Sequence, residues 1–477
     1  MLVKIAALVA IAIALAYAAT QKAGIDPGDW NASLLATGLI IAIYGALSGS
    51  AKVANLDRVT AICMIAVSAL VALQLVPLPA QVVRLLSPMR FELGAAAAQL
   101  TGGQMHNLTL SATPYETAEY LLTIAGYALV ILFVRHVTLQ LRDSAWLAIW
   151  PLLAVSGFEA ALGCYQAYVG VGAEGVTGTY VNRDHYAALL EIALPFALAY
   201  PIAVMQRDNR RHESAARPSI KACIAISVFV LLLVGIILSL SRMGFVAMLS
   251  SIFVVVAAVV LTRNPHNLPE TRDRQWPKWL MVGGLAVVVG LGFFYLQTDA
   301  LVARFALTGV PGDVSSETRI QIWKDTKQLI KDYPLFGCGA GSYDSCFLRY
   351  KTVAPMNTVD YAHNDYLQVL AEFGVFGFVA GLIFVARLLM LTIRGAFSRG
   401  SSDNRFIAIA CLGSMTAILL HSLVDFNMYV PTNGFAFAWV LGLAAAASPR
   451  RRKIPEKLAG SSRPAFTVRQ DSLGVHP

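Results

Sequence analysis

The chain has 477 residues, of which 57% are hydrophobic and only 14% are charged, and its formal net charge is +9. Soluble domains carry about 25% charged residues, so this composition, with repeated apolar runs of about 20 residues, excludes an ordinary soluble protein. The positive charge gathers in short loops and in the C-terminal tail, a pattern that the positive-inside rule explains without a nucleic-acid partner.

The apolar runs predict an all-α polytopic membrane protein with about twelve transmembrane helices. Only helices and closed barrels satisfy backbone polar groups in lipid, and runs that are continuous rather than alternating select helices. The first run alone could be interpreted as a signal peptide, but the spans that follow closely favour an uncleaved helix. The predicted spans are 2–20, 32–50, 59–76, 116–137, 145–169, 184–205, 221–240, 243–262, 279–297, 366–393, 405–424 and 429–447.

The short loops predict the orientation of these spans. With the N-terminus inside, the inside loops are rich in Arg and Lys, whereas the short outside loops carry few basic residues. Basic loops stay in the cytoplasm, so both termini are predicted to be cytoplasmic and two long segments to face outward. The predicted divisions are N-terminal helices with an outer connector (1–140, connector about 77–115), a transmembrane core with a large outer loop (141–448, loop about 298–365) and a basic, disordered tail (449–477).

Two features of the outer segments leave alternatives open. The connector is interpreted as lying on the membrane surface, with a short interfacial helix as the alternative. The six cysteines show neither a CxxC pair nor a metal-binding spacing. Cys338 and Cys346 both lie in the large loop, where a disulfide is chemically possible if the loop is periplasmic, but the sequence does not fix the required geometry.

Polar residues interrupt the apolar pattern at four points on the predicted outer side. Arginine at membrane depth is costly, so it usually faces a partner or a polar cavity, although an arginine at the interface can also extend to the surface. Guanidinium groups bind phosphate oxygens with paired hydrogen bonds, and a histidine beside them can act as a general base. The four points contain Asn182, Arg183 and His185; Ser241 and Arg242; Arg319 and Trp323; and His363, Asn364 and Asp365.

Acidic residues offer fewer candidates. Glu191 lies inside the sixth span, where an ionised carboxylate is costly, so a paired or protonated role is expected. Asp425 is interpreted as a helix-end residue at the outer surface. The outer loop has no pair of carboxylates suited to a sugar-nucleotide metal, so no metal and no cofactor are predicted.

At these points the chain resembles the O-antigen ligase and polymerase superfamily of bacterial inner membranes. The resemblance covers about residues 150–430, and the N-terminal third matches only in its hydrophobic spans. One departure is Asp184 beside Arg183, which could partly neutralise that arginine. The matching motifs are Tyr180 to Tyr186, Ser241 to Gly244, Arg319 to Trp323, Pro334 to Gly339, His363 to Gln368 and Glu372 to Gly374.

The resemblance implies a metal-independent, inverting glycosyltransferase with a helical bundle similar to the membrane C type. Its donor would be a glycan on undecaprenyl diphosphate, with Arg242 and Arg319 binding the diphosphate and Arg183 supporting it. His363 would activate or orient the acceptor hydroxyl. Asn182, His185, Glu191 and Asp365 are supporting candidates.

The acceptor is less clearly indicated. The first interpretation is a ligase that transfers a finished polymer to lipid A–core. A polymerase that acts on another lipid-linked repeat unit and a transferase that acts on protein are alternatives within the superfamily. From a different class, a transporter or flippase would line a path with arginines, but the sequence has no visible repeat. The expected partners are therefore the lipid-linked donor, a glycan or lipid A–core acceptor and membrane lipids, with no nucleic acid.

Overall fold

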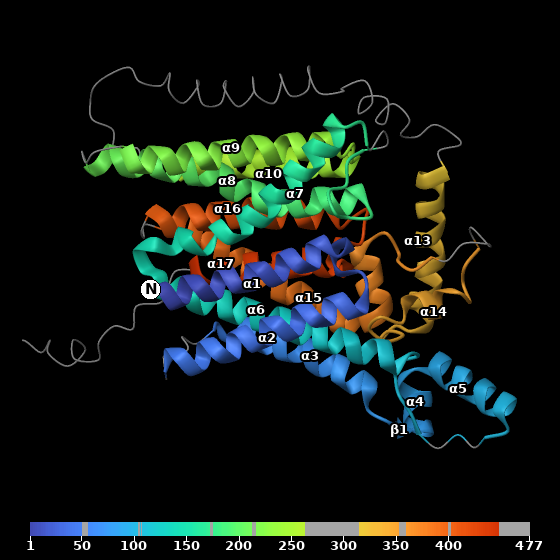
Figure 1. Ribbon diagram of the computed structural model, residues 1–477. Coiled ribbons are helices and arrows are strands. Elements are labelled where there is room, and N and C mark those ends of the chain that lie inside the picture. Colours follow the sequence, from blue (N-terminus) through green and yellow to red (C-terminus); the bar gives the residue numbers. More distant parts are fainter. Residues whose placement is uncertain are drawn as a thin grey trace, which may run out of the picture.

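Long helices that run side by side make up most of the protein, as the computed structural model shows (Figure 1). The structure describes residues 1–49, 56–103, 105, 107–171, 175–211, 216–262, 314–352, 359–398 and 402–447. The predicted span 279–297, the first part of the predicted outer loop and the predicted tail 449–477 lie outside these residues.

Nine helices in the described part of the chain are long and apolar enough to cross a membrane. Each corresponds to a predicted span, so the prediction of an all-α polytopic membrane protein is confirmed. The nine are α1 (Leu2–Thr20), α2 (Pro27–Ser48), α3 (Arg58–Leu75), α6 (Pro114–Leu141), α8 (Arg183–Arg211), α9 (Ala216–Leu238), α10 (Arg242–Leu261), α15 (Asp365–Ala396) and α16 (Ser402–His421).

Two more predicted spans form helices that fall short of these criteria. The helix α7 (Trp150–Tyr168) follows the 3-10 helix η2 (Arg142–Ala148) and contains the polar residues Glu159 and Gln166, which make it less apolar. The helix α17 (Pro431–Ala447) has only 17 residues, but nearly all of them are buried. Both helices pack within the bundle.

The helix α8 is enclosed by its neighbours, with α7, α9, α10, α16 and α17 packed against it. Its side chains from Tyr186 to Phe196 are almost completely buried. Lipid tails are as apolar as leucine, so helices in a membrane associate through close packing, and small residues such as Ala187, Ala188 and Ala193 allow that packing. The start of α8 is therefore fixed rigidly.

Side-chain caps explain where several helices begin. The carboxylate of Asp26 accepts a hydrogen bond from Gly28 N and Pro27 follows it, so α2 begins before the predicted residue 32. Ser241 caps α10 through Gly244 N, and Asn364 caps α15 through Leu367 N. These caps place the first turns of α10 and α15 close to their predicted positions.

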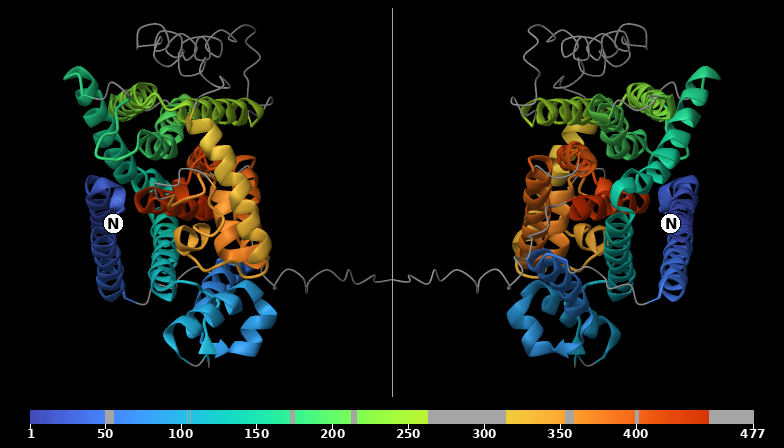
Figure 2. Two further views of the ribbon diagram at one scale, coloured as in Figure 1. Left: turned by 90° about the vertical axis from the view of Figure 1, so that its right-hand side faces the viewer. Right: turned by 90° about the vertical axis from the view of Figure 1, so that its left-hand side faces the viewer.

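Polar elements gather at one end of the bundle, opposite the N-terminus (Figure 1). In the outer connector, β1 (Leu78–Pro79) pairs antiparallel with β2 (Asn107–Leu108). Between these strands, α4 (Ala80–Leu86) packs against α5 (Pro88–Thr101), so the connector contains two helices, one more than the alternative expected. The large loop contributes α13 (Val314–Asp332) and α14 (Tyr343–Phe347), and α13 runs obliquely across this end (Figure 2, left). The two short 3-10 helices η1 (Lys22–Gly24) and η4 (Asn427–Tyr429) complete the described elements.

Candidate active site

Four helix ends meet at the outer end of the bundle. The helices α8, α10 and α15 begin there with Arg183, Arg242 and Asp365, and α16 ends there with His421. The first turn of a helix has unpaired N–H groups and carries the positive end of the helix dipole, so this region favours an anionic ligand. Three of the four polar points of the sequence therefore lie at this end, and α13 brings the fourth, Arg319 and Trp323, to the same end.

Asp425 lies between two candidate histidines. Its Oδ1 is 3.6 Å from His185 Nε2 and 3.4 Å from His363 Nδ1, and the carboxylate is 1% exposed. The ring of Phe426 packs edge-on against both imidazoles. Burial raises the pKa of Asp425, but the histidines, His185 foremost, outweigh it and hold that pKa well below its usual range. The ionised carboxylate can orient His363 and stabilise its protonated form.

The backbone of His363 adopts an unusual conformation, with φ at 48°, in the left-handed region that few non-glycine residues occupy. Neighbouring side chains hold it there. Trp323 Nε1 donates to Ala362 O at 3.0 Å and to His363 O at 3.3 Å. Gln368 Oε1 accepts a hydrogen bond from Ala362 N at 2.7 Å. The surrounding contacts thus fix the direction in which the imidazole leaves the chain.

The next acid in the motif has a structural contact of its own. Asp365 is 4% exposed, and its Oδ2 accepts a hydrogen bond from Met428 N at 3.2 Å. Its backbone N–H donates to Ser422 O and to Asp425 O. Asp365 therefore ties the start of α15 to the loop that carries Asp425.

Arg319 and α8 are linked by an ion pair. Arg319 Nη2 lies 3.9 Å from Asp184 Oδ2, and both side chains are partly exposed. The sequence suggested that Asp184 could partly neutralise Arg183, and the structure places Asp184 within ion-pair distance of Arg319. Asn182 Oδ1 accepts a hydrogen bond from Asp184 N at 2.8 Å and thereby caps the start of α8. The result is that α13, which carries Arg319, is joined to the first turn of α8.

Arg183 and Arg242 lie on either side of the loop at Gly175, where the backbone is closely packed. Gly175 adopts a φ of 115°, and a side chain there would collide with Ser239 O and touch Arg183 Cδ. The loop before α8 therefore passes between Arg183 and the turn that precedes Arg242. This close approach puts both arginines on the same side of the outer end.

Glu191 forms a buried pair with a residue that the sequence did not single out. His421 Nδ1 lies 3.2 Å from each carboxylate oxygen of Glu191, and both side chains are fully buried. A side chain added at Gly244 would approach Glu191 Oε1, so α10 packs closely over this pair. An intramembrane acid needs such a partner, and the pair lies beneath the turn that carries Arg242.

The motifs Pro334–Gly339 and Glu372–Gly374 serve to join the outer loop to α15. Cys338 N donates to Ala371 O, and Val375 N donates to Pro334 O. Gly374, with φ at 63°, breaks α15 at this contact, and a side chain there would collide with Leu335 O. The motifs therefore hold the loop in place.

Gln74 at the end of α3 completes this junction and was missed in the sequence. Its Nε2 donates to Phe336 O at 2.7 Å and to Glu372 O at 2.8 Å, and its Oε1 accepts a hydrogen bond from Ala340 N at 3.0 Å. The side chain is 2% exposed. A glutamine at the end of an apolar span was its only signal.

Cysteines and metal ligands add nothing to this centre. Cys338 and Cys346 are both buried and both free, so the disulfide considered from the sequence is not formed. Within the described ranges, no group of three or more His, Cys, Asp or Glu residues is arranged to hold a metal ion. Metal independence is a statement about the reaction and stays a prediction.

The structure thus brings His185, His363 and Asp365 around Asp425, and it brings Arg319 to α8. Asp425 follows the end of α16 at the outer end of the bundle, as expected, but it is buried and does not lie at the surface. It could have been found only as an acid that follows a polar His421-Ser422 pair at the end of an apolar span.

A comparison with known families supports the same conclusion. Residues 227–382 match the model of the family described as O-Antigen ligase. The match begins within α9, ends within α15 and includes Arg242, Arg319, His363 and Asp365. No curated protein matches the chain. Residues 227–382 therefore carry an O-antigen ligase domain, and this match supports the superfamily of O-antigen ligases and polymerases and a glycosyltransferase activity of that type.

Proposed function

We propose that the protein transfers a glycan from undecaprenyl diphosphate to an acceptor hydroxyl at the periplasmic face of the bacterial inner membrane, as an O-antigen ligase with lipid A–core as acceptor. The observation that carries this proposal is the joint position of Arg319 on α13, the start of α8 and the His363–Asp425 pair at one end of the bundle. In this orientation both termini are cytoplasmic.

The arginines bind the donor in this scheme. Arg242, Arg319 and Arg183 contact the diphosphate, and the first turns of α8 and α10 add the positive ends of their dipoles. Charge grows on the diphosphate as its bond to the anomeric carbon breaks, and fixed guanidinium groups stabilise that charge. A metal ion is therefore not required for departure of the leaving group.

His363 activates the acceptor. Its imidazole accepts the hydroxyl proton while the hydroxyl oxygen bonds to the anomeric carbon from the face opposite the diphosphate, so the configuration inverts. The free undecaprenyl diphosphate leaves with the electron pair of the broken bond. Asp425 holds the imidazole and stabilises the imidazolium that forms, and His185 shares the same carboxylate.

One experiment, with purified protein and a synthetic undecaprenyl diphosphate-linked glycan, distinguishes the role of the arginines from that of the histidine. Arg242→Ala and Arg319→Ala should weaken donor binding and abolish transfer, and lysine should rescue poorly because it lacks the guanidinium fork. His363→Ala should bind the donor normally and lose about 10²- to 10⁴-fold in turnover. Near-normal turnover in folded His363→Ala protein would contradict the assignment.

The metal requirement is tested in the same assay. Transfer should continue after treatment with a chelator. Complete loss of transfer that Mg²⁺ or Mn²⁺ restores would show that the arginines do not suffice for the leaving group.

A further inference from the structure

A large cavity runs down from the candidate active site into the bundle. Its volume is about 1080 Å³, above the 300–1,000 Å³ range of ordinary ligand pockets. His363 and Asp365 line its outer part, and Ile131 of α6 and Leu441 of α17 line its inner part. Along α6 the lining extends from Glu119 to Ile131, and at 1.5 Å per residue this separation of 12 positions covers about 18 Å. The cavity therefore reaches well into the hydrocarbon layer.

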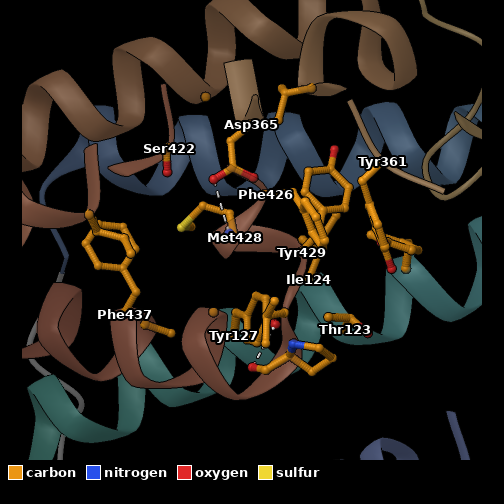
Figure 3. Close-up of a pocket in the computed structure, with 18 of the residues that line it drawn as sticks. Thr123, Ile124, Tyr127, Tyr361, Asp365, Ser422, Phe426, Met428, Tyr429 and Phe437 are labelled. Atoms are coloured by element: carbon orange, nitrogen blue, oxygen red, sulfur yellow. Dashed lines mark hydrogen bonds between the residues drawn. The ribbon is translucent and has the colours of Figure 1, made fainter. Parts of the chain in front are cut away.

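The lining changes in character from one end to the other. The inner part is apolar and aromatic, with the rings of Tyr127 and Phe437 facing the cavity (Figure 3). Ile25 and Leu382 also line it and are 48% and 54% exposed. An apolar inner part below a polar outer part suits an amphiphile.

The outer part is polar and acidic. Glu119, Asp360 and Asp365 are the acidic residues of the lining, and no described residue that lines the cavity is Lys or Arg. Asp365 is 4% exposed and points its carboxylate into the cavity (Figure 3). Its Oδ2 accepts the hydrogen bond from Met428 N, whereas Oδ1 has no hydrogen-bond partner among the described residues. A buried carboxylate oxygen of this kind calls for a hydrogen-bond donor from a ligand.

Charge decides which substrate fits. A diphosphate needs cationic groups around it, and the described lining contains neither Lys nor Arg, whereas sugar hydroxyls can hydrogen-bond to Asp365 Oδ1. Arg183, Arg242 and Arg319 do not line the cavity. His363 thus lies beside a cavity whose acidic residues can bind hydroxyl groups, and the arginines assigned to the donor lie outside this cavity.

We propose that this cavity binds the apolar anchor of the acceptor, a lipid whose hydroxyl-bearing head group meets Asp365 at the mouth and presents its reacting hydroxyl to His363. This rests on the proposed function, because it takes the arginines as the donor site. It makes the acceptor a membrane lipid and excludes a protein side chain in this cavity.

Gly381 offers a direct test. It lines the cavity, and a Cβ at this position would meet no atom within 4 Å, so a bulky side chain can fill the cavity without a backbone clash. Gly45 on α2 is the matched control, since it also lies in a membrane helix with open space around its Cβ but does not line the cavity. The variants are Gly381→Phe and Gly45→Phe. Ala386→Phe fills the same cavity if Gly381→Phe does not fold.

The probe is a neutral diacyl glycolipid with a photoreactive acyl chain, applied to purified protein in vesicles. It should label the peptides 119–131 and 381–389, and labelling should fall at least tenfold in Gly381→Phe while Gly45→Phe labels normally. Excess polyprenyl diphosphate should not reduce it. A photoreactive polyprenyl diphosphate that labels these peptides and displaces the glycolipid would overturn the proposal and assign the cavity to the donor chain. No labelling above that of Gly381→Phe by either probe would also overturn it.

Labelling of the cavity by the lipid probe can be measured independently of glycan transfer. Labelling should persist in His363→Ala, because the cavity needs no catalytic base to hold a lipid. Loss of transfer with retained labelling supports both assignments, and retained transfer in His363→Ala with normal labelling removes only the catalytic one.

Discussion

Replacing Asp425 with asparagine keeps the shape of the side chain and removes the charge between His185 and His363. Two unit charges about 4 Å apart interact by about 4 kcal/mol at an effective dielectric constant of 20. The observed separation from His363 is 3.4 Å, and asparagine retains a carbonyl oxygen that can still accept a hydrogen bond. We therefore expect turnover to fall by on the order of 10²-fold, which corresponds to about 3 kcal/mol.

The assay separates this effect from a loss of folding. Turnover should fall while donor affinity stays normal, since the arginines are unchanged. Asp344→Asn, which removes an exposed carboxylate in the same outer region, is the control and should behave as the unmodified protein.

A purely structural role for Asp425 would give a different result. In that case Asp425→Asn would lower the melting temperature in detergent but leave turnover within twofold. That outcome would refute the electrostatic reasoning and would leave His363 without an orienting partner.

Three further predictions concern stability and orientation. Gln74→Leu leaves buried groups of the loop junction without partners, so the free energy of unfolding should fall by about 3 kcal/mol and transfer should weaken. The control is Gln81→Leu at an exposed position, which should have no effect. An unchanged melting temperature in Gln74→Leu would show that the junction does not depend on Gln74. Arg387 donates two hydrogen bonds to Asp57 and lowers the pKa of that carboxyl to about 2. The pair should therefore add about 1 kcal/mol to the free energy of unfolding above pH 4, and this contribution should be lost as the pH falls toward 2. Asp57→Asn should remove this pH dependence of stability, and a pH dependence that persists in the variant would show that other groups cause it. A reporter fused after Pro88 should report a periplasmic location, and a cytoplasmic signal would invert the orientation.

The observed helices agree closely with the predicted spans where length and hydrophobicity alone decide the position of a helix. The span predicted at 59–76 is α3 at Arg58–Leu75, and the span predicted at 243–262 is α10 at Arg242–Leu261. A helix needs about 20 apolar residues to cross the hydrocarbon layer, and this requirement can be read along the chain without knowing its neighbours. The same one-dimensional pattern, together with the basic loops, was enough to place the four polar points on one side.

Only the tertiary structure decided which of these points touch. His185 and Asp425 are 240 residues apart in sequence, and Gln74 and Phe336 are 262 apart, so their contacts depend on how the helices pack side by side. Packing in lipid comes from shape and small residues, which leave little trace in hydrophobicity. The pairing of Asp184 with Arg319, the burial of Asp425 and the acidic cavity beside His363 all arise in this way, because each joins segments whose contact no local pattern records.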